Sequence, residues 1–217
     1  MKHTMEQHAG KILNELKKTY PQAGCSLTFR TPLELLVATI LSAQCTDVRV
    51  NKVTPTLFQQ FRTAQDYADA PIELLEEFIR MTGFFRNKAK NIQSACREII
   101  ARFDGDVPDT MEALVSLPGV GRKTANVVLS NGFGRTEGIT VDTHVFRLSH
   151  RMGLALGKTP EKVELELMQL FPKSDWTFLS HALILHGRQV CTARTAQCEK
   201  CSVRKVCPGR GTIKKLR

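Results

Sequence analysis

The sequence predicts an all-α protein. Residues that cap helices precede several apolar segments, and within those segments apolar residues recur every three or four positions, as on one face of a helix. Runs in which apolar and polar residues alternate between turn signals are too short to be convincing strands. We therefore expect a helical fold, and 217 residues allow one large or two modest domains.

The first predicted helix begins at a recognisable cap. Thr31, followed three residues later by Glu34, forms a capping box that opens an apolar segment ending near Ser42. Caps of the same kind occur at Asp109–Glu112 and Thr159–Glu161, and each precedes residues with helical spacing. These three signals predict where three of the helices start.

Other stretches complete the helical pattern and suggest a boundary. Apolar residues at 74–79 and 92–103 have the spacing of helix faces that pack into a core. The stretch Gly132–Gly138 contains three glycines and is the best internal boundary on composition.

Positive charge is concentrated in the last thirty residues. The formal charge is +10 at pH 7, and residues 188–217 hold nine basic residues against one acidic residue. Such a segment favours polyanionic partners, although a charge run is often only a solvated face. No apolar segment approaches the roughly 20 residues that span a bilayer. Residues 1–10 also lack the apolar core of a secretory signal, so we expect an intracellular protein.

Four of the seven cysteines lie close together. They are Cys191, Cys198, Cys201 and Cys207, with six, two and five residues between successive members. In a reducing compartment such a group indicates a metal centre and not disulfides. Tetrahedral zinc and a four-iron cluster both use four thiolates, and the presence of a single close pair favours the cluster while leaving zinc open. The metal would fix the neighbouring basic residues in short loops suited to phosphates.

The segment Leu117–Ala125 predicts a tight turn between two helices. Gly119 and Gly121 permit backbone angles closed to other residues and remove side chains near the start of the second helix. Amide groups there could then face a phosphate. Alternatively, Gly119 only ends a helix and Gly121 only aids packing.

Four features, in this order along the chain, resemble the endonuclease III family of bifunctional DNA glycosylases in the helix-hairpin-helix superfamily. They are the segments Leu41–Asp47, Leu117–Ala125 and Val141–Arg147, and the four-cysteine spacing. The resemblance covers nearly the whole chain. It implies a base-excision-repair enzyme that removes oxidised pyrimidines from duplex DNA and cleaves the abasic strand by β-elimination through a lysine Schiff base.

The resemblance also implies an architecture. Two helical domains would flank a DNA-binding cleft: a six-helix domain with the helix-hairpin-helix at 25–134, and a second domain made of 1–24 and 135–217. The second domain would end in the loop of a [4Fe-4S] cluster bound by the four cysteines named above. A monomer is the default for a cleft that wraps duplex DNA, and we expect a cytoplasmic, nucleoid-associated protein with no membrane partner.

Residue roles follow from the same alignment. The family's catalytic lysine aligns with Lys123 and its catalytic aspartate with Asp142, one from each domain. Lys123 would attack C1′ of the sugar once the base is extruded, and Asp142 would stabilise the positive charge that develops there. Because an ordinary lysine is protonated at pH 7, this implies surroundings, Arg122 among them, that disfavour the charged form. Asp142 is also in position to cap a helix that starts at Thr143.

The same alignment names residues that contact DNA. Gln44 and Phe84 align with side chains that enter the space left by the extruded base, and relatives often have a smaller aliphatic residue where Phe84 stands. The expected DNA-binding set is Gln44, Phe84, Gly119, Gly121 and Arg122.

The residues alone leave three other functions possible. An adenine glycosylase of the same superfamily would lack a lysine at position 123 and carry a further C-terminal domain. A DNA-binding scaffold would use Lys123 only as a cation, and an electron carrier would use the cluster alone. Three histidines, at 144, 181 and 186, are interpreted as core or surface residues outside the metal set.

Overall fold

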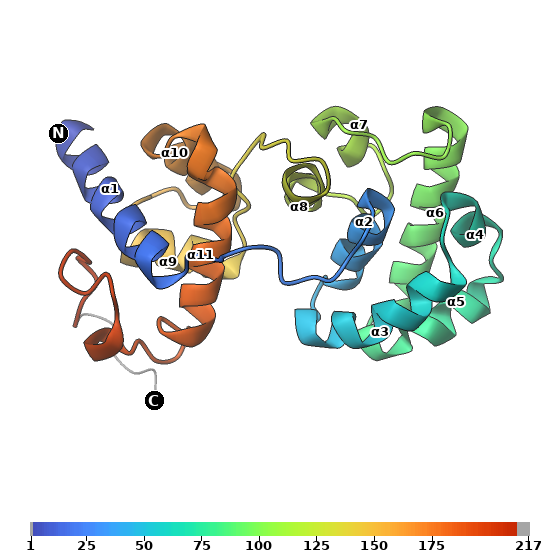
Figure 1. The fold of residues 1–217 in the computed structure, drawn as a ribbon, viewed down its shortest axis with the longest axis horizontal. Helices are drawn as coiled ribbons and strands as arrows, with labels where there is room; N and C mark the ends of the chain where they lie inside the picture. The colour runs from blue at the N-terminus through green and yellow to red at the C-terminus, as the bar shows by residue number, and fades with distance from the viewer. Residues whose placement is uncertain (1, 212–217) are drawn as a thin grey trace. The chain divides into compact units, whose positions relative to one another are not determined.

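The described residues of the protein form α-helices joined by loops, which confirms the all-α prediction. The computed structural model describes residues 2–211, and there is no β-strand among them (Figure 1). Lys214, Lys215 and Arg217 of the basic segment lie outside the described residues, as does Met1. The chain divides into two compact units, Cys25–Glu137 and Met1–Gly24 with Gly138–Arg217.

The unit Cys25–Glu137 contains seven α-helices and one 3-10 turn, where six helices were expected. The count depends on helices as short as α7, which has five residues. The elements are α2 (Pro32–Leu41), α3 (Asp47–Gln60), α4 (Ala64–Asp69), α5 (Ile72–Ile79), η1 (Arg80–Thr82), α6 (Phe85–Phe103), α7 (Met111–Val115) and α8 (Arg122–Gly132).

Helix α2 is central to this unit and packs against α3, α6 and α8. The hydroxyl of Thr31 accepts the N–H of Glu34 at 3.2 Å, as predicted. The carboxylate of Glu34, however, accepts the N–H of Arg30 at 2.6 Å and binds the Arg30 guanidinium at 2.7 Å. Only the threonine half of the predicted capping box is therefore formed, because the arginine competes for the glutamate.

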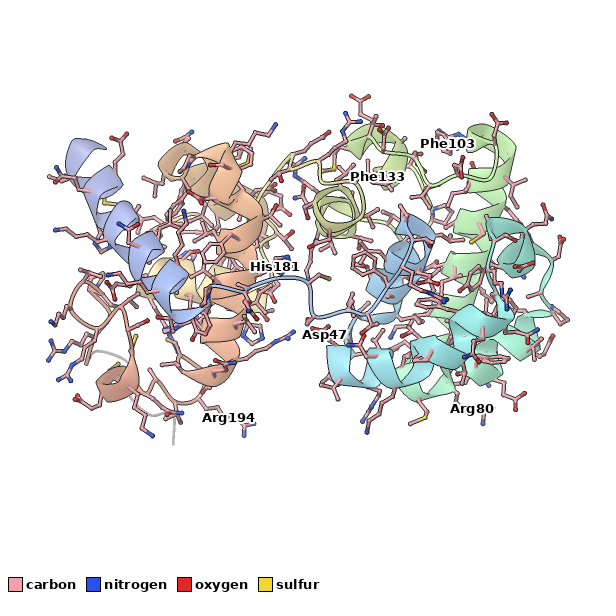
Figure 2. The ribbon with its side chains drawn as sticks, viewed as in Figure 1. Asp47, Arg80, Phe103, Phe133, His181 and Arg194 are labelled. Atoms are coloured by element: carbon pink, nitrogen blue, oxygen red, sulfur yellow. The ribbon has the colours of Figure 1, made fainter. Side chains whose placement is uncertain are left out.

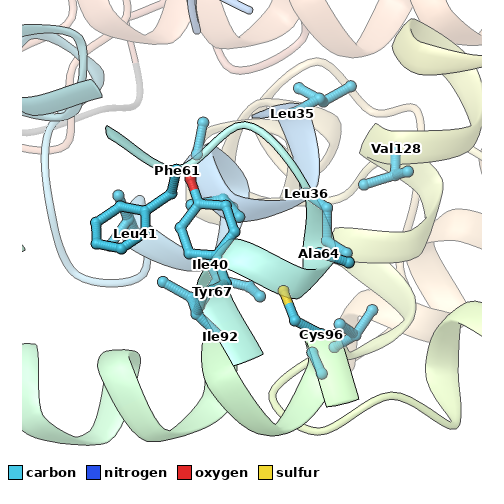
Figure 3. Packing of buried hydrophobic residues seen from close by; sticks show 14 of the residues in the cluster. Leu35, Leu36, Ile40, Leu41, Phe61, Ala64, Tyr67, Ile92, Cys96 and Val128 are labelled. Atoms are coloured by element: carbon cyan, nitrogen blue, oxygen red, sulfur yellow. The ribbon is translucent and has the colours of Figure 1, made fainter. Parts of the chain in front are cut away.

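The core of this unit is built from aliphatic side chains of α2, α6 and α8 and two aromatic rings. Leu35, Leu36 and Leu41 are almost fully buried. The rings of Phe61 and Tyr67 stack with their centroids 5.1 Å apart (Figure 3). Complete burial of one aliphatic side chain stabilises the fold by about 1.5–3 kcal/mol, so these residues hold α2 against its neighbours. Further aromatic residues, Phe103 and Phe133, are partly buried against this core and are labelled in Figure 2.

The other unit consists of the first helix and the C-terminal part of the chain. Its elements are α1 (Lys2–Thr19), α9 (Thr143–Arg151), α10 (Pro160–Leu170), η2 (Lys173–Asp175), α11 (Trp176–Gln189) and η3 (Cys198–Lys200). Helix α11 packs against α9 and α1, and its buried Leu183 joins Leu16 and Leu148 in a second core. Lys17 and Asp175 form an ion pair at 2.6 Å between α1 and η2. Among the described residues, no helix has the length and apolar character needed to cross a membrane.

Candidate functional site

The turn between α7 and α8 needs glycine at one position and not at the other. Gly119 has φ +76°, and a Cβ there would lie 2.7 Å from Cβ of Asn91, so both backbone and space require glycine. Gly121 has φ −91° and ψ 172°, which any residue adopts, and an added Cβ would meet no atom within 4 Å. The expectation that Gly121 needs a special backbone angle is therefore wrong.

Gly121 lies at the start of α8, where it contributes no side chain. It occupies the N-cap position, and no side chain caps this helix. The N-terminus of a helix presents backbone N–H groups and partial positive charge, which together favour an anion. Arg122 and Lys123 are the first two residues of α8, and both are exposed.

Gln44 and Phe84 share an unusual backbone conformation. Their φ angles are 52° and 48°, in the left-handed region that non-glycine residues rarely adopt. Both residues are exposed, and the Phe84 side chain is a large apolar group at the surface, 64% accessible. Such strained positions cost of order 1–3 kcal/mol and concentrate at functional sites.

One pocket brings these two residues together with the hairpin. Gln44, Phe84 and Gly119 all line it, as do Lys88 and Asn91 of α6. Gly121, Arg122 and Lys123 are not among its lining residues. Three of the five predicted DNA-contacting residues therefore surround a single pocket of the unit Cys25–Glu137. Lys88 was not predicted, because a lone lysine in an amphipathic helix carries no sequence signal.

Asp142 is the N-cap of α9, in the other unit. Its Oδ1 accepts the backbone N–H groups of His144 and Val145, both at 2.8 Å. The side chain is half-buried, and both cap bonds within the described residues go to Oδ1. The capping role anticipated from the sequence is thus confirmed, and it leaves Oδ2 available to a ligand.

The four clustered cysteines line one pocket. All are free thiols; Cys191 is buried, and Cys198, Cys201 and Cys207 are half-buried. In the part of the chain that the structure describes, no three His, Cys, Asp or Glu side chains are grouped closely enough to hold a metal ion. The four cysteines nevertheless line the same pocket, and four thiolates are the donor set that iron–sulfur clusters use.

Two side chains contact these sulfur atoms: His186, which was expected to be only a core or surface residue, and Arg151, which the sequence did not single out. Nε2 of His186 is 3.3 Å from Sγ of Cys201, and Nδ1 of the same ring is 3.0 Å from the hydroxyl of Tyr20. Burial lowers the pKa of His186 to about 4, so the ring is neutral. Arg151 donates a hydrogen bond to Sγ of Cys191 at 3.3 Å. These contacts join segments far apart in sequence, so spacing could not reveal them.

Comparison with known proteins agrees with this geometry. Residues 37–173 match the HhH-GPD superfamily of base excision DNA repair proteins. The chain is 57% identical over 203 residues to Endonuclease III of Synechocystis, covering 94% of this chain and 93% of the relative. It is 42% identical to Endonuclease III of Escherichia coli, with coverage of 91% and 93%. The chain belongs to the endonuclease III family. Like that family, it is a base-excision-repair enzyme, a DNA glycosylase and abasic-site lyase.

Solved structures support the same family assignment and share the fold of this chain. A non-covalent Endonuclease III–DNA complex superimposes with a TM-score of 0.91 at 45% identity, covering 95% of this chain and 97% of the other. A trapped covalent Endonuclease III–DNA intermediate matches equally well, with the same TM-score, identity and coverage. A thermostable thymine-DNA glycosylase, at 23% identity and a TM-score of 0.81, shares the fold.

Proposed function

We propose that this enzyme removes oxidised pyrimidines from duplex DNA, with Lys123 as the nucleophile and Asp142 as the carboxylate that assists it. The observation that carries this proposal is the position of Lys123. It is exposed in the first turn of α8, directly after a hairpin whose helix start is left uncapped for a phosphate. An amine held there can reach the sugar beside a bound phosphate.

The reaction begins with extrusion of the damaged base, which costs a few kcal/mol and least for a damaged base. Gln44 and Phe84 would fill the space in the stack and offset that cost. The amine of Lys123 then forms a bond to C1′ while the bond from C1′ to the base breaks, and the base departs. Oδ2 of Asp142 stabilises the positive charge that develops on the sugar and accepts the proton released by the amine.

The second activity uses the same amine. Opening of the sugar ring gives an imine between Lys123 and C1′. Loss of a proton from C2′ then expels the 3′ phosphate, so the strand breaks by β-elimination. Hydrolysis of the imine finally releases the enzyme. The trapped covalent Endonuclease III–DNA complex, 45% identical to this chain, supports a covalent route of this kind.

We further propose that Cys191, Cys198, Cys201 and Cys207 bind a [4Fe-4S] cluster. Four free thiols line a single pocket, and Arg151 and His186 supply polar contacts to two of the sulfurs, as outer-shell groups commonly do. When bound, the cluster would supply four iron–sulfur bonds that fix the loop. Basic residues within that loop, Lys200, Arg204 and Lys205, would then contact the DNA backbone. Iron and sulfide analysis separates this cluster from zinc.

The two compact units would then be the functional domains, with expected ranges 25–134 and 1–24 with 135–217. Lys123 of one and Asp142 of the other would act on the same nucleotide. We propose that the enzyme works as a monomer on duplex DNA, within the nucleoid.

The experiment is a cleavage and trapping assay. Wild-type protein, Lys123→Gln and the control Lys158→Gln are incubated with duplexes that contain thymine glycol or an abasic site, with and without borohydride. Lys158 is an exposed lysine of the other unit. Wild type and Lys158→Gln should cleave both substrates and form a trapped adduct. Lys123→Gln should bind DNA but neither cleave nor trap it, and normal trapping by this variant would refute the assignment.

The same assay tests the other functions. A non-catalytic scaffold would leave both duplexes uncut by the wild type. An adenine glycosylase would release a base from a mispair without a lysine adduct. An electron carrier would leave DNA unchanged in every arm.

A further inference from the structure

A buried lysine joins the two loops that carry Gln44 and Phe84. Lys88 of α6 is 4% accessible. Its Nζ donates one hydrogen bond to the carbonyl of Leu41 and another to the carbonyl of Thr82, each 2.8 Å long. Leu41 is the last residue of α2, and Thr82 is the last residue of η1. A single amine nitrogen therefore connects the C-terminal ends of two separate elements.

Each of these carbonyls lies two or three residues before a strained residue. Gln44 follows Leu41 by three residues and Phe84 follows Thr82 by two, and both have left-handed backbone conformations. Residues in this region persist only when the surrounding structure holds them. Lys88 supplies such a restraint to both, and it lines the same pocket as the two side chains.

The hydrogen bonds of Lys88 are made without an opposite charge nearby. Within the described residues its amine forms no ion pair with a carboxylate, and burial lowers the pKa of that amine. Its partners are carbonyl oxygens. That of Leu41 is among the last four of α2, which have no partner inside the helix and carry partial negative charge. A methionine would fill the same volume without the cost of desolvating a charge, but it could not donate to either carbonyl.

We propose that Lys88 is a positioning residue that fixes the Gln44 and Phe84 loops relative to each other, so that both side chains enter the base stack together. The inference rests on the proposed function, because it assumes that these residues fill the space of an extruded base. Without Lys88 each loop can relax separately. The Gln44 and Phe84 side chains are then no longer held in place before they enter the base stack, while the hairpin and Lys123 are unchanged.

The same helix offers a matched control. Gln93 is also a buried polar residue of α6, and its Nε2 donates to the carbonyls of Tyr67 at 3.4 Å and Ala70 at 2.8 Å. It thus makes the same kind of link, from α6 to two carbonyls, in a part of the unit that does not line the pocket with Gln44 and Phe84. Gln93→Met measures what the loss of such a link costs in stability alone.

The experiment compares wild type, Lys88→Met and Gln93→Met as full-length holoenzymes. The first readout is the fluorescence of 2-aminopurine placed beside the lesion, which rises when the base stack is opened. The second is the single-turnover rate of base release from a thymine glycol duplex. The third is borohydride trapping on an abasic site in single-stranded DNA, which requires no stack to be opened. Thermal unfolding is measured for all three proteins.

Lys88→Met should lose most of the fluorescence rise and release the base at least tenfold more slowly, while trapping on single-stranded DNA stays within about twofold of wild type. Gln93→Met should lower the unfolding temperature yet keep the fluorescence rise and base release within about twofold. Equal fluorescence and base release in Lys88→Met and Gln93→Met would overturn the proposal. Absence of trapping by the wild type would instead count against the proposed function.

A milder variant keeps the test decisive if Lys88→Met does not fold. Lys88→Gln retains a polar donor but is too short to reach both carbonyls. It should show the same pattern of reduced fluorescence and base release with retained trapping, and a wild-type pattern in this variant would equally overturn the proposal.

Discussion

Arg151 and Cys191 are joined by a hydrogen bond of 3.3 Å from the guanidinium to the sulfur. The same guanidinium donates to the carbonyl of Thr192 at 2.7 Å. Arg151 is the last residue of α9, and Asp142 caps the first turn of that helix. One nine-residue helix thus connects the proposed catalytic carboxylate with the proposed cluster loop, so order in the loop helps to fix the helix that carries Asp142.

Loss of the Arg151 side chain should make the proposed cluster easier to remove. Arg151→Met deletes the hydrogen bonds that a charged donor makes to Cys191, Thr192 and Ala193, each of a kind typically worth about 1.5–3 kcal/mol. The visible absorbance of the holoenzyme should therefore bleach faster with an iron chelator than in wild type. Arg194→Met, which removes an exposed arginine of the same loop (Figure 2), serves as the control. Identical bleaching rates in the two variants would show that the Arg151 contact does not stabilise the loop.

Asp142→Asn should separate catalysis from helix capping. Asparagine caps helices about as well as aspartate, so the free energy of unfolding should change by less than about 0.5 kcal/mol. Base release should fall by about a hundredfold or more, because the negative charge that stabilises the sugar is gone. Binding to an uncleavable abasic-site analogue should change little. A parallel loss of affinity and turnover would point to a structural role.

Gly119→Ala and Gly121→Ala should differ in stability. The first places a Cβ 2.7 Å from Asn91 at a φ of +76°, so it should destabilise the fold by about 1–3 kcal/mol. The second puts a Cβ in open space at an ordinary φ, and it should cost at most about 1 kcal/mol as a poorer N-cap. Urea unfolding of both variants measures the difference, and equal midpoints would contradict the steric explanation.

Stability should fall in mild acid through His181, which lies on α11 (Figure 2). Burial lowers the pKa of His181 below its ordinary value. Below about pH 6.5 the unfolded chain binds a proton at this residue while the folded chain resists it, so stability present at higher pH is lost as the pH falls. His181→Gln should flatten this dependence by up to about 1.4 kcal/mol per pH unit. Unfolding curves between pH 7.5 and 5.5 provide the measurement, and parallel slopes would exclude a contribution from His181.

Local signals predicted the helix starts well. Thr31, Thr110 and Thr159 each accept a hydrogen bond from the backbone three residues ahead. Such contacts lie within one turn, so the order of residues specifies them directly. Where a local signal had a competitor, the prediction was incomplete: Glu34 binds Arg30 and leaves the capping box half formed.

The residues of the candidate site likewise fall into those that the sequence predicts and those that only the folded chain reveals. Residue type and short spacing identified the hairpin and the four cysteines, and the resemblance to the family pointed to Lys123 and Asp142. The motifs could not identify Lys88, whose partner Leu41 is 47 residues away, or the contact of His186 with Tyr20 across 166 residues.

By itself, the sequence determined the helical class and the family, and it named the residues that we propose carry the chemistry. The tertiary structure alone decided which buried polar groups support them. A buried donor must find its acceptor somewhere in the folded chain, and packing between helices, not spacing along the chain, selects that acceptor.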